Sequence, residues 1–294
     1  MRNILFFIII LISLFLIIGL SSCSENNTIG PTDGMEEGSW VTYSPYDWNH
    51  DGSPYTSIHC KVYSDGAPTQ MKRVAGQLAD RKFLEILEQF NFENNNDFLY
   101  PPGNNEINVY INRNHQENIC AAYWGTIFIT VRSSILDTNR YDYLFKHELT
   151  HTFEFLIEGT VNLGTDVWFR EGTAVYIGSN GGWDYICNVD SLNSWRTRNS
   201  SFPNKGNPIS IHQWEDFPEG SDITGYYTLF NAVMIYILDS NGLGMSLQNI
   251  LDLFYDLRNG TPFSTAFENN FGNSLIEFEN DIFNRLESYM RGNL

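Results

Sequence analysis

The spacing of apolar and polar residues predicts strands in the first part of the chain. Residues 57–63 alternate between polar and apolar side chains, as a half-buried strand does. The β-branched and aromatic runs at 107–111 and 126–131 predict two further strands. Residues 70–90 repeat their apolar positions at the helical period, which predicts an amphipathic helix. A Pro/Gly/Asn-rich turn at 101–105 separates this helix from the next strand.

The later part of the chain is predicted to be helical. Residues 139–157 place their apolar side chains at helical spacing, and residues 167–176 predict a second helix after a break at Gly164. Further helical patterns, separated by Gly and Asn breaks, occupy residues 226–238, 247–257, 262–267 and 274–290. The sequence therefore predicts the α+β class, with strands in the first half and helices in the second.

This change of pattern predicts two lobes. We expect an N-terminal α/β lobe over residues 41–160, with a mixed sheet and the helix of 139–157, and a helical C-terminal lobe over residues 161–294. Residues 23–40 are polar and rich in Gly, Asn and acidic side chains, which predicts a tether. A cleft between two lobes is a common place for an active site.

The first residues form a targeting segment. Arg2 precedes a long apolar run, and Leu20-Ser21-Ser22-Cys23 resembles a bacterial lipobox. This predicts a signal peptide over 1–22 and a lipid on Cys23. The alternative is an uncleaved membrane anchor, which leaves the body of the protein on the same side of the membrane. We expect a protein anchored in a bacterial cell envelope, facing the periplasm or the cell surface.

Charge and cysteine content narrow the function. The chain has 35 acidic and 17 basic residues and a formal net charge of -18. Nucleic acids and anionic membranes attract clustered Lys and Arg, so we expect no nucleic-acid partner. Beyond Cys23, the odd set of Cys60, Cys120 and Cys187 allows at most one internal disulfide, and we favour buried free thiols. None has the CxxC spacing of a cysteine zinc site.

Residues 147–151, HELTH, form an HExxH motif. Positions four apart lie one helical turn apart on the same face, so His147 and His151 can bind one ion. Glu148 lies between them, where it can take a proton from metal-bound water. The competing explanation is a pair of surface histidines on a helix.

A catalytic zinc site needs three protein ligands and one open position. Glu171 follows His151 by twenty residues, within the run WFREGTAVY. That separation allows the first helix to end, a loop to form and a second helix to return antiparallel, with Gly172 and Ala174 keeping the contact between helices close. Seen alone, Glu171 is an ordinary helical carboxylate; its place after HExxH makes it the third candidate ligand.

HELTH followed at this distance by WFREGTAVY resembles the gluzincin group of zinc metallopeptidases, with their thermolysin-like fold, and most closely the MA-like families of bacterial envelopes. The resemblance runs from about Thr56 to the end of the chain. It implies a single zinc ion on His147, His151 and Glu171, with Glu148 as general base acting on a peptide or protein substrate. It also implies that the run at 126–131 is the edge strand along which an extended peptide pairs.

The resemblance also implies an oxyanion donor from the C-terminal lobe. Tyr227 fits the expected pattern better, with Tyr226 as the alternative and aromatic packing as the competing explanation. In one respect the chain departs from the family. An acid that orients a zinc histidine often stands four residues after the ligand glutamate, and here that residue is Val175. The orienting group must come from elsewhere, such as Asp166, Asp184 or a backbone carbonyl.

Residues 47–52 resemble the start of a calcium loop. Asp47, Asn49 and Asp51 stand at alternate positions and a Gly stands sixth, but the twelfth position is Ile58, which cannot bind an ion. Turns rich in Asn and Asp share this pattern, so we prefer a turn to a Ca²⁺ site.

The leading hypothesis is therefore a zinc metallopeptidase, with endopeptidase and aminopeptidase activity both open. One alternative is a non-catalytic surface lipoprotein that binds a peptide or glycan on the same scaffold, yet such a protein has no need of Glu148. A structural zinc site would need a fourth ligand, often Cys, and the sequence offers no obvious one.

Overall fold

A computed structural model describes residues 52–113, 120–131, 135–160, 164–182, 186–198 and 223–292. The signal peptide, Cys23, the tether, Asp184 and the residues of the calcium-like loop (Asp47, Asn49 and Asp51) lie outside these described residues. Their predictions stay predictions.

The chain divides into two compact units. The first contains residues up to 81 together with 100–144, and the second contains residues 82–99 together with those from 145 onward. The division falls within two long helices, α2 (Thr69–Gln89) and α3 (Thr138–Glu158). The predicted lobe boundary at residue 160 remains a prediction.

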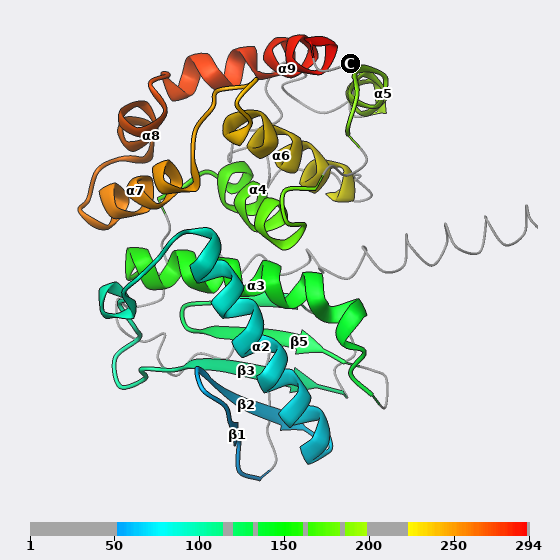
Figure 1. Cartoon of the computed structure of the whole chain (residues 1–294), viewed down its shortest axis with the longest axis vertical. Coiled ribbons are helices and arrows are strands. Elements are labelled where there is room, and N and C mark those ends of the chain that lie inside the picture. Colours follow the sequence, from blue (N-terminus) through cyan, green and yellow to red (C-terminus); the bar gives the residue numbers. More distant parts are fainter. Residues whose placement is uncertain are drawn as a thin grey trace, which may run out of the picture. The chain divides into compact units, whose positions relative to one another are not determined.

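A five-stranded mixed sheet forms the centre of the first unit (Figure 1). The strand order is β1-β2-β3-β5-β4. Strands β2, β3 and β5 run parallel, while β1 and β4 each pair antiparallel with their single neighbour. The strands are β1 (Tyr55–Thr56), β2 (Cys60–Asp65), β3 (Ile107–Asn112), β4 (Cys120–Tyr123) and β5 (Thr126–Thr130).

The prediction that residues 126–131 form an edge strand is wrong. Strand β5 lies between β3 and β4, and β4 is the edge. Gly125, with φ of +68°, turns the chain between β4 and β5, a backbone conformation that favours glycine. Strand β4 was not predicted, because its four residues, CAAY, include no β-branched side chain.

Alternation along the strands gives the sheet two different faces. Val62, Val109 and Ile127 are fully buried on one face. Helix α2 packs there, because a Cβ added at Gly76 would stand 3.2 Å from Val62 Cγ2. The opposite face carries a row of stacked rings, with centroids 4.9 Å apart for Tyr63–Tyr110 and 5.3 Å for Tyr110–Phe128.

The first predicted strand begins later than expected. Residues 57–59 form a turn instead, because Asp80 of α2 accepts hydrogen bonds from Ser57 Oγ and from the backbone N–H groups of Ile58 and His59. Strand β2 therefore begins at Cys60.

The described part of the second unit is helical apart from its turns. Besides the end of α2 and most of α3, it contains η3 (Asn95–Asp97), α4 (Val167–Gly178), α5 (Val189–Arg198), α6 (Ile223–Leu238), α7 (Leu247–Arg258), α8 (Phe263–Phe271) and α9 (Leu275–Gly292). The predicted helices are confirmed apart from shifts of a few residues at their ends. Helix α5, which is mostly polar, was not predicted.

Aromatic side chains fill the core of this unit. Phe153 of α3 packs against Phe90, Phe92 and Phe98, with ring centroids 4.6 to 5.8 Å apart. Trp168 of α4 stacks on Phe278 of α9 at 5.8 Å, and its indole N–H donates to buried Glu279 at 2.9 Å. The aromatic excess is thus largely structural here.

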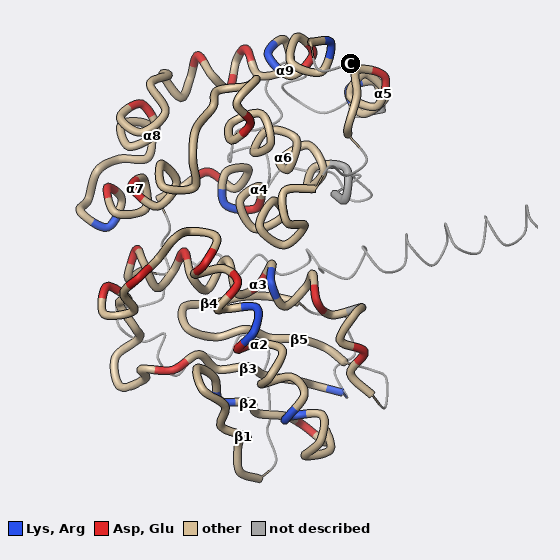
Figure 2. Tube along the Cα trace, in the orientation of Figure 1, with Lys and Arg blue, Asp and Glu red and all other residues tan. Residues whose placement is uncertain are grey.

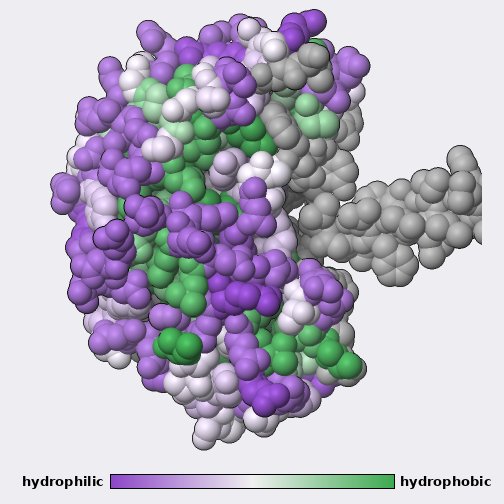
Figure 3. Space-filling view, in the orientation of Figure 1, coloured by the Kyte–Doolittle hydropathy of each residue, from purple (hydrophilic) through white to green (hydrophobic). Residues whose placement is uncertain are grey.

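These elements confirm the α+β class. Among the described residues, none of the helices has the length and apolar character needed to cross a bilayer. Acidic side chains are spread over many elements rather than gathered on one (Figure 2). The face in view mixes hydrophilic with apolar residues (Figure 3). Cys60, Cys120 and Cys187 are free thiols, as expected, but Cys187 is exposed.

Candidate metal centre

Helix α3 presents His147 and His151 on one face. Their rings meet edge to face with centroids 4.8 Å apart, and their Nε2 atoms are 3.2 Å apart. Both side chains are buried. The one-turn spacing therefore places two imidazole nitrogens at one point, as predicted from the motif.

Helix α4 brings Glu171 to the same point. Its Oε2 lies 3.2 Å from His151 Nε2 and 3.5 Å from His147 Nε2. The three side chains form a group that could hold a metal ion, with ligand atoms within 4.8 Å of one another. No fourth His, Cys, Asp or Glu joins this group among the residues that the structure describes.

The glycine after Glu171 serves a different contact from the one expected. We predicted that Gly172 keeps α4 close to the HExxH helix, whereas it faces α6. A Cβ added there would stand 2.8 Å from Met234 Cγ and 2.9 Å from the carbonyl oxygen of Phe230. Gly172 thus permits close packing of α4 on α6, which are side by side in Figure 1.

The side chain of Glu154 contacts His151, and sequence reasoning missed this neighbour. Glu154 Oε2 lies 3.0 Å from His151 Nδ1, on the ring edge away from Glu171. Asp166, one of the predicted candidates, is instead the N-cap residue of α4, where its carbonyl accepts from the N–H groups of Phe169 and Arg170. The i, i+3 spacing of a His and a Glu on one helix was the available signal.

The charges of the centre are strongly coupled. Burial raises the pKa of Glu171, but the two histidines outweigh it and hold that pKa well below its ordinary value. Burial opposes the charge on His151, yet Glu171 and Glu154 raise its pKa well above the usual range. Burial lowers the pKa of His147, and Glu171 offsets this only in part. Negative charge from two carboxylates thus surrounds one imidazole, an environment that suits a cation.

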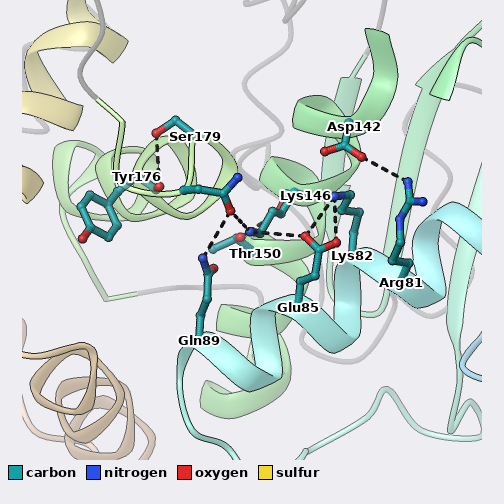
Figure 4. Close-up of polar contacts among 10 residues, drawn as sticks. Arg81, Lys82, Glu85, Gln89, Asp142, Lys146, Thr150, Tyr176 and Ser179 are labelled. Atoms are coloured by element: carbon teal, nitrogen blue, oxygen red, sulfur yellow. Dashed lines mark hydrogen bonds and ion pairs between the residues drawn. The ribbon is translucent and has the colours of Figure 1, made fainter. Parts of the chain in front are cut away.

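A second polar network holds the elements beside the centre. Lys146 directly precedes His147 and is almost fully buried. Its ammonium donates to Asn180 Oδ1, in the turn after α4, and lies 3.5 Å from Glu85 of α2 (Figure 4). Lys82 also pairs with Glu85, at 2.9 Å. These contacts tie α2, α3 and the end of α4 together next to the ligands.

The remaining predicted residues also lie in this unit. Glu148 is buried on α3 between the two histidines. The ring of Tyr227 meets that of His147 edge to face, with centroids 6.1 Å apart. Tyr226 points elsewhere: it is fully buried and packs on Trp195 at 5.0 Å.

No protein-family model matches this sequence. No curated protein matches it either. Among solved structures, the fold is similar to the M1 zinc metallopeptidase from Deinococcus radiodurans, with a TM-score of 0.43 and 14% identity over 81% of this chain and 49% of that chain. It is also similar to a mutant of a two-domain M1 zinc metallopeptidase bound to L-arginine, with a TM-score of 0.42 and 13% identity over 79% of this chain and 48% of that chain. The chain spans about half the length of these proteins.

Proposed function

We propose that this protein is a zinc-dependent metallopeptidase with His147, His151 and Glu171 as metal ligands. The observation that carries the proposal is the spacing of the three ligand atoms. Ligands bound about 2.0–2.1 Å from a tetrahedral Zn²⁺ stand roughly 3.3 Å apart. The three separations here are 3.2, 3.2 and 3.5 Å.

The identity of the donors supports zinc in a catalytic role. Two imidazole nitrogens and one carboxylate oxygen are a common ligand set of catalytic zinc, whereas structural sites are closed by four protein ligands. Glu171 is also the most accessible of the three, with 15% of its side chain exposed. Three ligands leave a position for water and substrate.

Zinc at this site would supply a Lewis acid that polarises the scissile carbonyl and acidifies water. Glu148 then accepts a proton from the attacking water on a carboxylate oxygen. The water oxygen bonds to the carbonyl carbon, and Glu148 passes the proton to the amine nitrogen as the C–N bond breaks. Burial of Glu148 keeps competing bulk water away from this transfer.

Tyr227 is the proposed oxyanion donor. Its ring lies against His147, a metal ligand, while Tyr226 packs on Trp195 in the core. A phenol O–H beside the ligands can donate to the carbonyl oxygen as negative charge develops there.

The proposal is tested with residues 24–294 and the Glu148→Gln variant. Bound zinc is measured by elemental analysis, and cleavage of a mixed peptide library is measured by mass spectrometry. We expect about one zinc in each protein. We expect cleavage by the wild type and a loss of at least 10²-fold in the variant, because the general base is gone.

Each other outcome has a defined meaning. Zinc in both proteins without cleavage by either favours the non-catalytic binding function. No zinc in a folded wild type contradicts the ligand assignment. Equal cleavage by both proteins removes Glu148 from the mechanism.

Tyr227→Phe tests the oxyanion assignment, with Tyr226→Phe as the matched control. We expect Tyr227→Phe to lower kcat by about 10²-fold with little change in KM, because the hydroxyl acts only in the transition state. Tyr226→Phe is expected to retain near wild-type kcat. The reverse order of effects would assign the role to Tyr226.

The cellular location is proposed from sequence alone. Lipid attachment at Cys23 would hold the enzyme in a bacterial cell envelope, facing the periplasm or the cell surface. Metabolic labelling with a fatty acid, compared between wild type and Cys23→Ala, tests this: label retained by the variant would reject the anchor.

A further inference from the structure

Glu154 is a buried carboxylate, and such a group needs a charged or hydrogen-bonding partner. Its side chain is fully buried in the second unit. Burying a carboxylate costs several kcal/mol unless the group is paired and hydrogen-bonded. Its contact with His151, at 3.0 Å, is the ion pair that the structure gives it. Burial raises the pKa of Glu154 above its usual value, while the contact with His151 and, at longer range, the positive charge of Arg170 oppose that rise.

The two nitrogens of His151 have different neighbours. Nε2 faces His147 and Glu171, both 3.2 Å away, while Nδ1 faces Glu154. A neutral imidazole carries one proton, and a carboxylate can only accept. Glu154 therefore favours the proton on Nδ1, which leaves the lone pair of Nε2 toward the metal position.

We propose that Glu154 is the positioning residue of the metal site, whose carboxylate holds the ring and the proton of His151 in the ligating state. This inference rests on the proposed function and adds a residue that the motif does not contain. Val175, the position at which the sequence resemblance led us to expect an orienting acid, is apolar and buried. In this chain the acid is on α3, three residues after the ligand that it orients.

Glu158 provides a matched control. It lies one turn after Glu154 on the same helix and is likewise buried, but its neighbours in charge are Glu154 and Arg170 rather than a ligand histidine. Replacing Glu158 removes a buried carboxyl group one turn further along the same helix and leaves the contact between Glu154 and His151 in place. A loss of affinity that came only from disturbing this buried part of α3 would appear in both variants.

The test measures zinc affinity by competition with a chromogenic chelator for the wild type, Glu154→Gln, Glu154→Met and Glu158→Met. We expect Glu154→Met to bind zinc 10- to 100-fold more weakly, the usual effect of losing such a partner. Glu154→Gln keeps an acceptor oxygen, so its zinc affinity is expected to lie between those of Glu154→Met and the wild type. Glu158→Met is expected to stay within about threefold of wild type.

A spectroscopic readout separates positioning from general damage. In the zinc-bound wild type, ¹⁵N-edited NMR should show a slowly exchanging Nδ1–H on His151. This signal should shift or disappear in Glu154→Gln. The substitution is nearly isosteric, and circular dichroism checks that the variant keeps the wild-type fold.

Three results would overturn the inference. They are wild-type affinity in both Glu154 variants, an unchanged His151 signal, or an equal loss in Glu158→Met. A wild type that binds zinc but cleaves nothing defeats the proposed peptidase while the affinity series still decides the role of Glu154. A folded wild type without zinc overturns both.

Discussion

Glu158 is a buried carboxylate with an altered titration. Burial raises its pKa to about 8, with Glu154 adding to the shift and Arg170 opposing it. In the unfolded chain the same group ionises near its ordinary value of 4.5. Between these values the folded protein holds a proton that the unfolded chain has lost.

This difference predicts how stability depends on pH. The native state binds more protons, so the free energy of unfolding from this group falls as pH rises from about 4.5 to about 8, by an amount on the order of a few kcal/mol. Glu158→Gln removes the titration and should be more stable than the wild type at pH 8, with the gap closing near pH 5. Urea unfolding at both pH values measures this, with exposed Glu277→Gln as control. A gap that does not change with pH would contradict the assignment.

The helices that carry the centre depend on close packing of backbones. Glu171 reaches the histidines only while α4 keeps its place, and α4 is held against α6 through Gly172. In the turn after α4, Asn180 accepts from Lys146, one residue before His147. Two contacts that follow Glu171 in the chain thus hold α4 in place.

Gly172→Ala is expected to destabilise the protein. The added Cβ would meet Met234 and the backbone of Phe230 at under 3.0 Å, so α4 and α6 must separate. Overpacking of this kind costs about 1–3 kcal/mol, more than the 0.5–1 kcal/mol that Ala gains over Gly in a helix. Thermal unfolding measures the change, and Gly292→Ala, with open space around it, should be near neutral. A Gly172→Ala protein as stable as the wild type would show that the contact relaxes freely.

At the scale of the whole molecule, the proposed site lies within one compact unit. The three ligands, Glu148, Tyr227 and Glu154 all belong to the unit that contains residues 82–99 and those from 145 onward. The three proposed ligands come from two helices of this unit, so the distances between them are fixed by packing inside it.

Several features followed from local sequence. The one-turn spacing of His147 and His151 predicted their convergence, because a helix fixes the directions of residues four apart. Glu171 was predicted as the third ligand because the twenty residues after His151 are enough for a loop and a second, returning helix. The α+β class and most helices followed from hydrophobic periodicity.

Other features were decided only by tertiary structure. Strand β4 has only a weak strand pattern in its sequence. It forms the sheet edge because it pairs with β5, which the tertiary structure decides. Tyr227, rather than Tyr226, lies beside His147 because the packing of α6 on α4 sets which side of α6 faces the ligands. Glu154 had a legible spacing to His151, but burial made it a partner instead of a solvated carboxylate. Local spacing determines what a helix can present; the neighbours that close around it determine which of those groups meet.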